Sequence, residues 1–162
     1  MLSTHPRRSF RLALKPVLSR EVEGMRSPTA ADEEQLASLM YHSYFGTIDY
    51  EGENEAAALA EVQRTFAGAY GSFSWSASQV VDRPGCLASA ALVTCWQGSP
   101  IVAFLMTRPE FKRQGFARAC LAGVVNQLLL KRESELRLVS TVGNVAAMEL
   151  YEKVGFVIDG NA

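Results

Sequence analysis

The sequence has little of what marks several specialised protein classes. Its three cysteines, Cys86, Cys95 and Cys120, form no CxxC pair, and its two histidines, His5 and His42, are far apart. These residues therefore predict neither a disulfide framework nor a metal site. No apolar run reaches the roughly 18 residues that a membrane-spanning helix needs. We expect a protein without a metal or a membrane span, located in a reducing compartment, the cytoplasm.

The sequence also has almost no excess of charge of either sign. Sixteen basic and 17 acidic residues give a formal net charge of -1. A protein that coats nucleic acid needs a broad basic surface, so this class is disfavoured and any functional charge must be local. The 162 residues, of which 48% are hydrophobic, suit one globular core. We expect an arm or extra strand in residues 1–24 and a single domain in residues 25–162.

Hydrophobic spacing and turn residues predict the order of helices and strands. Helices are expected from Thr29, within residues 52–71, after Gly115, and over residues 145–154 between an Asn144 N-cap and Gly155. Strands are expected over residues 72–81, 86–96, 101–107, 136–142 and 156–159. This order is typical of an α/β or α+β fold in which helices pack on a mixed sheet.

The most informative stretch is TRPEFKRQGFAR, residues 107–118, where a strand leads through a basic loop into a long helix. Free backbone amides at a helix N-terminus bind anions, and Gly115 and Ala117 leave room for close approach. The segment has one acid, Glu110, and four basic residues, Arg108, Lys112, Arg113 and Arg118. The loop therefore predicts a ligand that carries phosphate. Neither a GxxxxGK[ST] loop nor a GxGxxG fingerprint is present, so nucleoside-triphosphate and dinucleotide sites are disfavoured.

Two motifs resemble those of the GNAT superfamily of N-acyltransferases. Residues 112–117, KRQGFA, are similar to its diphosphate-binding pattern [QR]xxGx[GA]. Lys112 replaces the usual Gln or Arg, which keeps a cation but loses the fork geometry that Arg113 next to it can supply. Residues 144–156, NVAAMELYEKVGF, resemble the family's N-x-x-A-x-x-x-Y-x-x-x-G-F helix. The two motifs occur in the family's order, and the resemblance covers about residues 25–159.

The resemblance implies a mostly antiparallel central sheet, flanked by helices, that binds acetyl-CoA as co-substrate. Its strand ending at Thr107 and its strand over residues 136–142 would splay apart, and the pantetheine arm would lie between them. Met106 and Thr107 would offer backbone groups to the pantetheine, and Asn144 would meet its side. The diphosphate would be held around Lys112, Arg113, Gln114, Gly115, Phe116, Ala117 and Arg118.

The implied reaction moves an acetyl group to a primary amine by direct attack in a ternary complex. The acceptor would be a small molecule, a protein N-terminus or a lysine. Tyr151 holds the position from which family members protonate the departing thiolate, although its spacing with Met148 and Val154 also suits simple packing.

The resemblance places further residues near the acceptor. Candidates for the base are His42, Asp49, Glu51 and Glu53. Candidates for an acceptor pocket are Tyr41, Tyr44, Phe45, Tyr50 and Trp75. The alternative is a module that binds CoA without turnover.

The end of the sequence departs from the family pattern. The last expected strand begins near Phe156 and the sequence stops at Ala162, whereas family members usually continue into another strand. An unpaired sheet edge has to be covered or paired. We expect the N-terminal arm or a second subunit to fill the gap, and a strand from a second subunit would make a homodimer.

Overall fold

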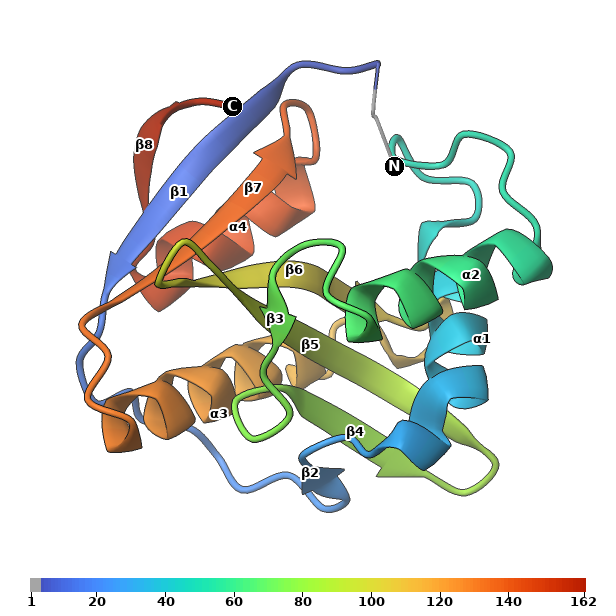
Figure 1. Cartoon of the computed structure of the whole chain (residues 1–162), viewed down its shortest axis with the longest axis horizontal. Helices are drawn as coiled ribbons and strands as arrows, with labels where there is room; N and C mark the ends of the chain where they lie inside the picture. The colour runs from blue at the N-terminus through green and yellow to red at the C-terminus, as the bar shows by residue number, and fades with distance from the viewer. Residues whose placement is uncertain (1–3) are drawn as a thin grey trace.

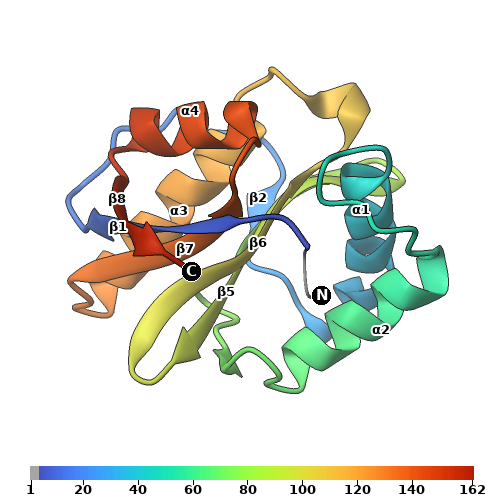
Figure 2. The same ribbon diagram turned by 90° about the horizontal axis from the view of Figure 1, so that it is seen from above.

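The computed structural model describes residues 4–162, which form one sheet with helices on both faces (Figures 1 and 2). The sheet has eight strands in the order β2-β4-β5-β6-β7-β1-β8, and β3 pairs with β5. Only β6 and β7 pair in parallel; the other pairs are antiparallel. The strands are β1 (Arg7–Ala13), β2 (Met25–Arg26), β3 (Ser72–Phe73), β4 (Gln79–Arg83), β5 (Cys86–Trp96), β6 (Ser99–Thr107), β7 (Glu135–Thr141) and β8 (Val157–Asn161).

Two helical layers bury the two faces of the sheet, as seen from above in Figure 2. Helices α1 (Glu33–Tyr44) and α2 (Glu55–Phe66) pack on one face, and α3 (Phe116–Leu130) and α4 (Val145–Val154) on the other. The central strand β5 is buried from Leu87 to Thr94 because it is covered on both sides. This arrangement confirms the predicted fold class of a mostly antiparallel sheet flanked by helices.

Local signals explain the boundaries of α4. The Asn144 side chain accepts a hydrogen bond from the Ala147 amide at 3.3 Å, and Gly155 ends the helix in the left-handed conformation with φ of 111°. Only glycine adopts that conformation without strain. The predicted cap and stop of this helix are confirmed.

One predicted strand, over residues 72–81, is interrupted. Only Ser72–Phe73 and Gln79–Arg83 are extended, because the Ser78 amide and hydroxyl both donate to the Ser74 carbonyl, at 3.0 and 2.7 Å. Serine side chains that bond to the nearby backbone favour turns over strands. The prediction of one continuous strand was wrong at this point.

Strand β1 comes from the N-terminal segment and fills the gap beside β7. It pairs with β7 from Arg7 opposite Thr141 to Ala13 opposite Glu135, and β8 pairs with its other edge. The blue strand lies between the orange and red strands in Figure 1. The chain's own arm therefore occupies the place for which a second subunit was the alternative. The boundary between residues 24 and 25 stays a prediction, and residues 1–3 of the predicted arm lie outside the described part of the chain.

Candidate active site

The parallel strands β6 and β7 separate after a short shared stretch. They pair at Ile101 opposite Arg137 and at Val102 opposite Leu138, and their later residues diverge. On the open edge of β6, the Thr107 amide donates to the Ser43 hydroxyl of α1 at 3.3 Å instead of to β7. The predicted splay between these two strands is confirmed, and Thr107 presents its backbone to it.

Met106 has a different orientation from Thr107. Its carbonyl accepts a hydrogen bond from the Ser89 hydroxyl of β5 at 2.8 Å, and its side chain is buried under α1 and α2. Successive residues of a strand point their backbone groups to opposite edges. The backbone groups of Met106 therefore point toward β5. Those of Thr107 point to the opposite edge of β6, which has no partner there among the strands of the described chain.

The loop from β6 to α3 presents backbone amides and basic side chains at the mouth of the splay. A short 3-10 helix, η2 (Pro109–Phe111), precedes it, and Arg113 and Gly115 are left-handed, with φ of 64° and 80°. Such turns point successive N–H groups to one side, next to the unpartnered amides of the first turn of α3. Of the predicted diphosphate residues, Phe116 is buried, Ala117 is half-buried, and Lys112, Arg113, Gln114, Gly115 and Arg118 are exposed.

Arg108 does not belong to the charged surface of this loop. Its side chain is 12% exposed, and its guanidinium donates to the Ser38 hydroxyl of α1 at 2.7 Å and lies 3.6 Å from the Glu110 carboxylate. Its charge is therefore directed toward α1 and Glu110. The cations that remain on the loop are Lys112, Arg113 and Arg118.

Arg20 adds a cation to the loop that sequence reasoning missed. Its Nη2 donates to the Gln114 carbonyl, and a Cβ placed on Gly115 would lie 3.5 Å from the same nitrogen. The residue belongs to the segment that connects β1 to β2, which passes α3 on its way. The basic character of the first twenty residues was the only signal, and it did not indicate where Arg20 would lie.

Tyr151 is buried on α4 beside the splay. Its ring packs between Phe10 of β1 and Phe156, with centroid distances of 5.6 and 5.8 Å, and its phenol makes a hydrogen bond with Ser140 of β7. Burial raises the pKa of Tyr151 to about 12, the bond with Ser140 lowers it and the nearby charge of Asp49 raises it further. Tyr151 therefore stays protonated at neutral pH, as a proton donor must.

Of the four candidate bases, Asp49 reaches the strands of the splay. Its Oδ1 accepts from the Thr141 hydroxyl at 2.5 Å, and its Oδ2 lies 3.5 Å from the donor Nδ2 of Asn144. Both partners lie at the C-terminal end of β7, where the resemblance places the pantetheine. The structure thus brings Asp49, Asn144 and Tyr151 to one region.

The other three candidate bases have partners elsewhere. The Nδ1 of His42 bonds to the Ser38 carbonyl within α1 at 2.8 Å. Glu51 accepts from the Thr4 amide at 3.1 Å, and Glu53 accepts from the Glu51 amide at 2.9 Å. None of the three has a described contact with β6, β7 or α4.

Four of the five candidate pocket aromatics come from the end of α1 and the loop after it, and the fifth, Trp75, comes from the segment between β3 and β4. Tyr41, Phe45 and Tyr50 form one cluster, with Tyr41 and Tyr50 5.7 and 5.0 Å from the Phe45 ring. Tyr44, at the end of α1, is electrostatically coupled to Tyr151 and Asp49, and burial raises its pKa. Trp75 instead packs on Phe66 and Phe73. Tyr44 therefore adjoins the splay, and Trp75 belongs to another cluster.

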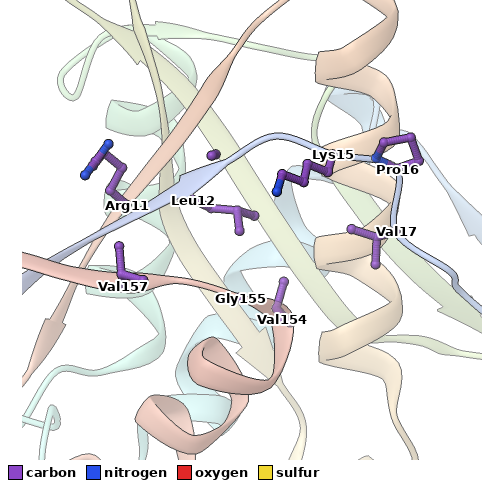
Figure 3. A pocket seen from close by; sticks show the side chains of 9 residues that line it. Arg11, Leu12, Lys15, Pro16, Val17, Val154, Gly155 and Val157 are labelled. Atoms are coloured by element: carbon purple, nitrogen blue, oxygen red, sulfur yellow. The ribbon is translucent and has the colours of Figure 1, made fainter.

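A cavity between β1 and α4 is separate from this region. It has a volume of about 490 Å³ and lies between β1, the arm and the end of α4, where Arg11, Lys15, Val17 and Val154 line it (Figure 3). No residue of the loop or the splay contributes to its wall.

Residues 4–162 contain no group of three His, Cys, Asp or Glu side chains that could hold a metal ion. Cys120 is fully buried in the core, and burial raises the pKa of its thiol to about 12, which disfavours a reactive thiolate. No helix in this part of the chain is long and apolar enough to span a membrane.

Comparisons with known proteins agree with this geometry. Residues 88–161 match the model of the family described as FR47-like protein. A comparison with curated protein sequences gave no match. A GNAT-family acetyltransferase structure from Novosphingobium aromaticivorans is 23% identical, with a TM-score of 0.68 over 97% of this chain and 61% of its own. A GCN5-related N-acetyltransferase structure from Sphaerobacter thermophilus is 16% identical, with a TM-score of 0.72 over 97% of this chain and 49% of its own.

A third structure has a more specific name. It is the ribosomal-protein-S18-alanine N-acetyltransferase of Escherichia coli, 20% identical, with a TM-score of 0.62 over 81% of this chain and 75% of its own. At these identities the likeness establishes the fold, and this chain spans about 61% and 49% of the first two relatives. The FR47-like match covers residues 88–161, and the shared architecture agrees with the two sequence motifs: the chain has the fold of the GNAT acetyltransferases.

Proposed function

We propose that the chain is an acyl-CoA-dependent N-acyltransferase that moves an acetyl group from acetyl-CoA to a primary amine. The observation that carries the proposal is the pairing of an open strand edge with an anion-binding loop at its mouth. β6 leaves β7 after Val102, and the left-handed Arg113 and Gly115 follow at its C-terminal end. A linear ligand with amides at one end and phosphates at the other fits this combination.

The donor would bind along β6 and over the N-terminus of α3. Its pantetheine amides would pair with the backbone of Thr107, replacing the long bond to Ser43, and Asn144 would meet them from the opposite side. Its diphosphate would accept hydrogen bonds from the amides of residues 113–117. Lys112, Arg113 and Arg118 would neutralise the phosphates.

Acetyl transfer needs an acid for the leaving group, and Tyr151 is suited to that role. A neutral amine attacks the thioester carbon, the carbon–sulfur bond breaks, and the sulfur takes the phenolic proton of Tyr151, while the nitrogen loses one proton that restores the phenol. Because the pKa of Tyr151 is raised to about 12, that proton is present at neutral pH. Positioning of both substrates in one complex supplies much of the rate.

The acceptor is an amine on a small molecule, a protein N-terminus or a lysine. The name of the Escherichia coli relative, which specifies an alanine of a ribosomal protein, supports a protein N-terminus as one member of this set. We place the reaction in the cytoplasm, since the three cysteines are free thiols, which a reducing compartment preserves.

A panel of amines with acetyl-CoA tests this function. The readouts are release of the CoA thiol and the mass of the acetylated amine, with samples lacking an amine as the control for hydrolysis. The proposal predicts amine-dependent thiol release with at least one acceptor. Binding of CoA without transfer to any amine would instead identify a non-catalytic CoA-binding module, and absence of CoA binding would contradict both functions.

A further inference from the structure

The loop between α1 and α2 rests on the end of β7 and on the turn between β7 and α4. Asp49 of this loop binds Thr141 and Asn144, at 2.5 and 3.5 Å. Beside it, the Cδ1 of Ile48 lies 3.2 Å from where a Cβ of Gly143 would stand. The two hydrogen bonds therefore hold a carboxylate at the C-terminal end of β7, beyond its last pairing with β6.

The Asp49 carboxylate has no cation as a partner in the described chain. None of the ion pairs of residues 4–162 involves it, and its two hydrogen-bond donors are neutral. A carboxylate has about four acceptor positions, so positions remain for a ligand. A half-buried anion with neutral partners favours a positively charged ligand.

Asp49 also lies close to the proton donor of the reaction. Its charge raises the pKa of Tyr151 on α4 and of Tyr44 on α1, in each case after burial as the larger cause. The other charged groups that act on Tyr44 are Arg7 of β1, which lowers its pKa, and Glu61 of α2, which raises it. The anion and the neutral phenol also adjoin consecutive residues of β7, since Asp49 accepts from Thr141 and Tyr151 interacts with Ser140.

We propose that Asp49 binds the ammonium group of the acceptor and takes its proton. This inference rests on the proposed acyltransferase function and restricts the acceptor to amines that are cationic in solution. The ammonium gives one proton to Asp49, and the nitrogen lone pair forms the bond to the thioester carbon. The carbon–sulfur bond breaks, sulfur takes the Tyr151 proton, and the protonated amide nitrogen returns a proton to Tyr151. Asp49 releases its proton to water, so the overall reaction liberates one proton.

The test compares Asp49→Asn with the wild type in full-length protein. The Asn side chain keeps an oxygen for Thr141 but cannot accept a proton. We expect kcat to fall about 100-fold, within the range of general-base catalysis, with unchanged affinity for acetyl-CoA. The loss should shrink as the pH rises and for amines of lower pKa, because these supply more neutral amine without a base. Glu55→Gln, which changes an exposed acid at the start of α2 right after the same loop, is the matched control and should keep the wild-type rate.

Asp49→Ala and Asp49→Glu separate a chemical role from a structural one. If Asp49 only holds the loop, Asp49→Asn stays within about twofold of wild-type kcat while Asp49→Ala loses activity, and the inference is overturned. Asp49→Glu retains a carboxylate and should recover part of the rate, with a pH profile like that of the wild type. Wild-type protein that transfers acetyl to no amine would overturn the proposed function itself, an outcome distinct from an active Asp49→Asn variant.

Discussion

The ring of Phe10 lies 5.6 Å from the ring of Tyr151, so a strand from the start of the chain packs against the proposed acid near its end. Phe10 is 2% exposed and belongs to the core between the sheet and helices α3 and α4. The N-terminal strand therefore supports both the stability of this core and the position of the phenol.

Replacing Phe10 by Ala should lower the free energy of unfolding by about 3–5 kcal/mol, since a buried ring is removed and a cavity remains. Urea denaturation monitored by circular dichroism measures the change. Leu18→Ala is the control, because Leu18 is 99% exposed and its loss should cost less than about 0.5 kcal/mol. Equal stability of the two variants would mean that β1 does not pack as described.

Tyr151→Phe should lower kcat about 100-fold without changing the KM for acetyl-CoA, because only the proton donor is removed. Steady-state kinetics at saturating amine measures both constants. Since the raised pKa of about 12 keeps the phenol protonated, the wild-type rate should show no decline from Tyr151 ionisation through about pH 10. An undiminished kcat would show that Tyr151 only packs between its two aromatic neighbours.

Asp32 should make stability depend on pH at the acid end. Both Nη atoms of Arg26 donate to its carboxylate at 2.8 Å, and this interaction holds the pKa of Asp32 below its ordinary value of 3.8. The stabilisation is therefore complete above pH 3.8 and is lost as the pH falls through the lower pKa of the folded state. Asp32→Asn should cost about 2 kcal/mol at neutral pH and progressively less in acid.

Urea unfolding of wild type and Asp32→Asn across this pH range measures the effect. Glu34→Gln, an exposed acid in the same part of α1, should cost less than about 1 kcal/mol. A difference between wild type and Asp32→Asn that stays constant in acid would argue against the Arg26 interaction as its source.

Arg20→Ala should weaken CoA binding about 10-fold, because a cation is removed from beside Gln114 and Gly115. Its effect on an acetylated pantetheine, which lacks the diphosphate, should be negligible. Isothermal calorimetry with both ligands makes the comparison, and Lys15→Ala, a basic residue on the same arm that lines the separate cavity, is the control. Equal weakening by the two variants would point to general charge rather than to contact with the loop.

The elements around the loop of residues 112–117 were predictable because their signals are local. Gly115 opens α3, Asn144 and Gly155 bound α4, and each acts within a few residues through backbone conformation or a side-chain cap. The two family motifs place these same elements. Helix periodicity and turn chemistry were therefore enough for this half of the fold.

The place of β1 depends on contacts that sequence patterns do not contain. Phe10 pairs with Leu138, and only two residues of this short strand, Phe10 and Leu12, are buried. A pattern this short cannot distinguish a strand from an irregular arm. The insertion of β1 between β7 and β8 results from long-range pairing and became visible only in the folded chain.

The same limit applies to the proposed base. Asp49, Glu51 and Glu53 are similar acids within five residues of one another, and composition does not separate them. The contacts of Asp49 with Thr141 and Asn144 do so, since they cross more than ninety positions of sequence. The contact of Arg20 with Gln114 was not predicted for the same reason, since these residues are also far apart in the sequence.

Calorimetric titration of the folded protein with coenzyme A tests the central claim most directly. The account predicts one-to-one binding with a dissociation constant in about the micromolar range, and much weaker binding of pantetheine, because the amides around Gly115 have no phosphate to hold in that ligand. No heat with coenzyme A up to about 1 mM, from protein that is folded by circular dichroism, would contradict it.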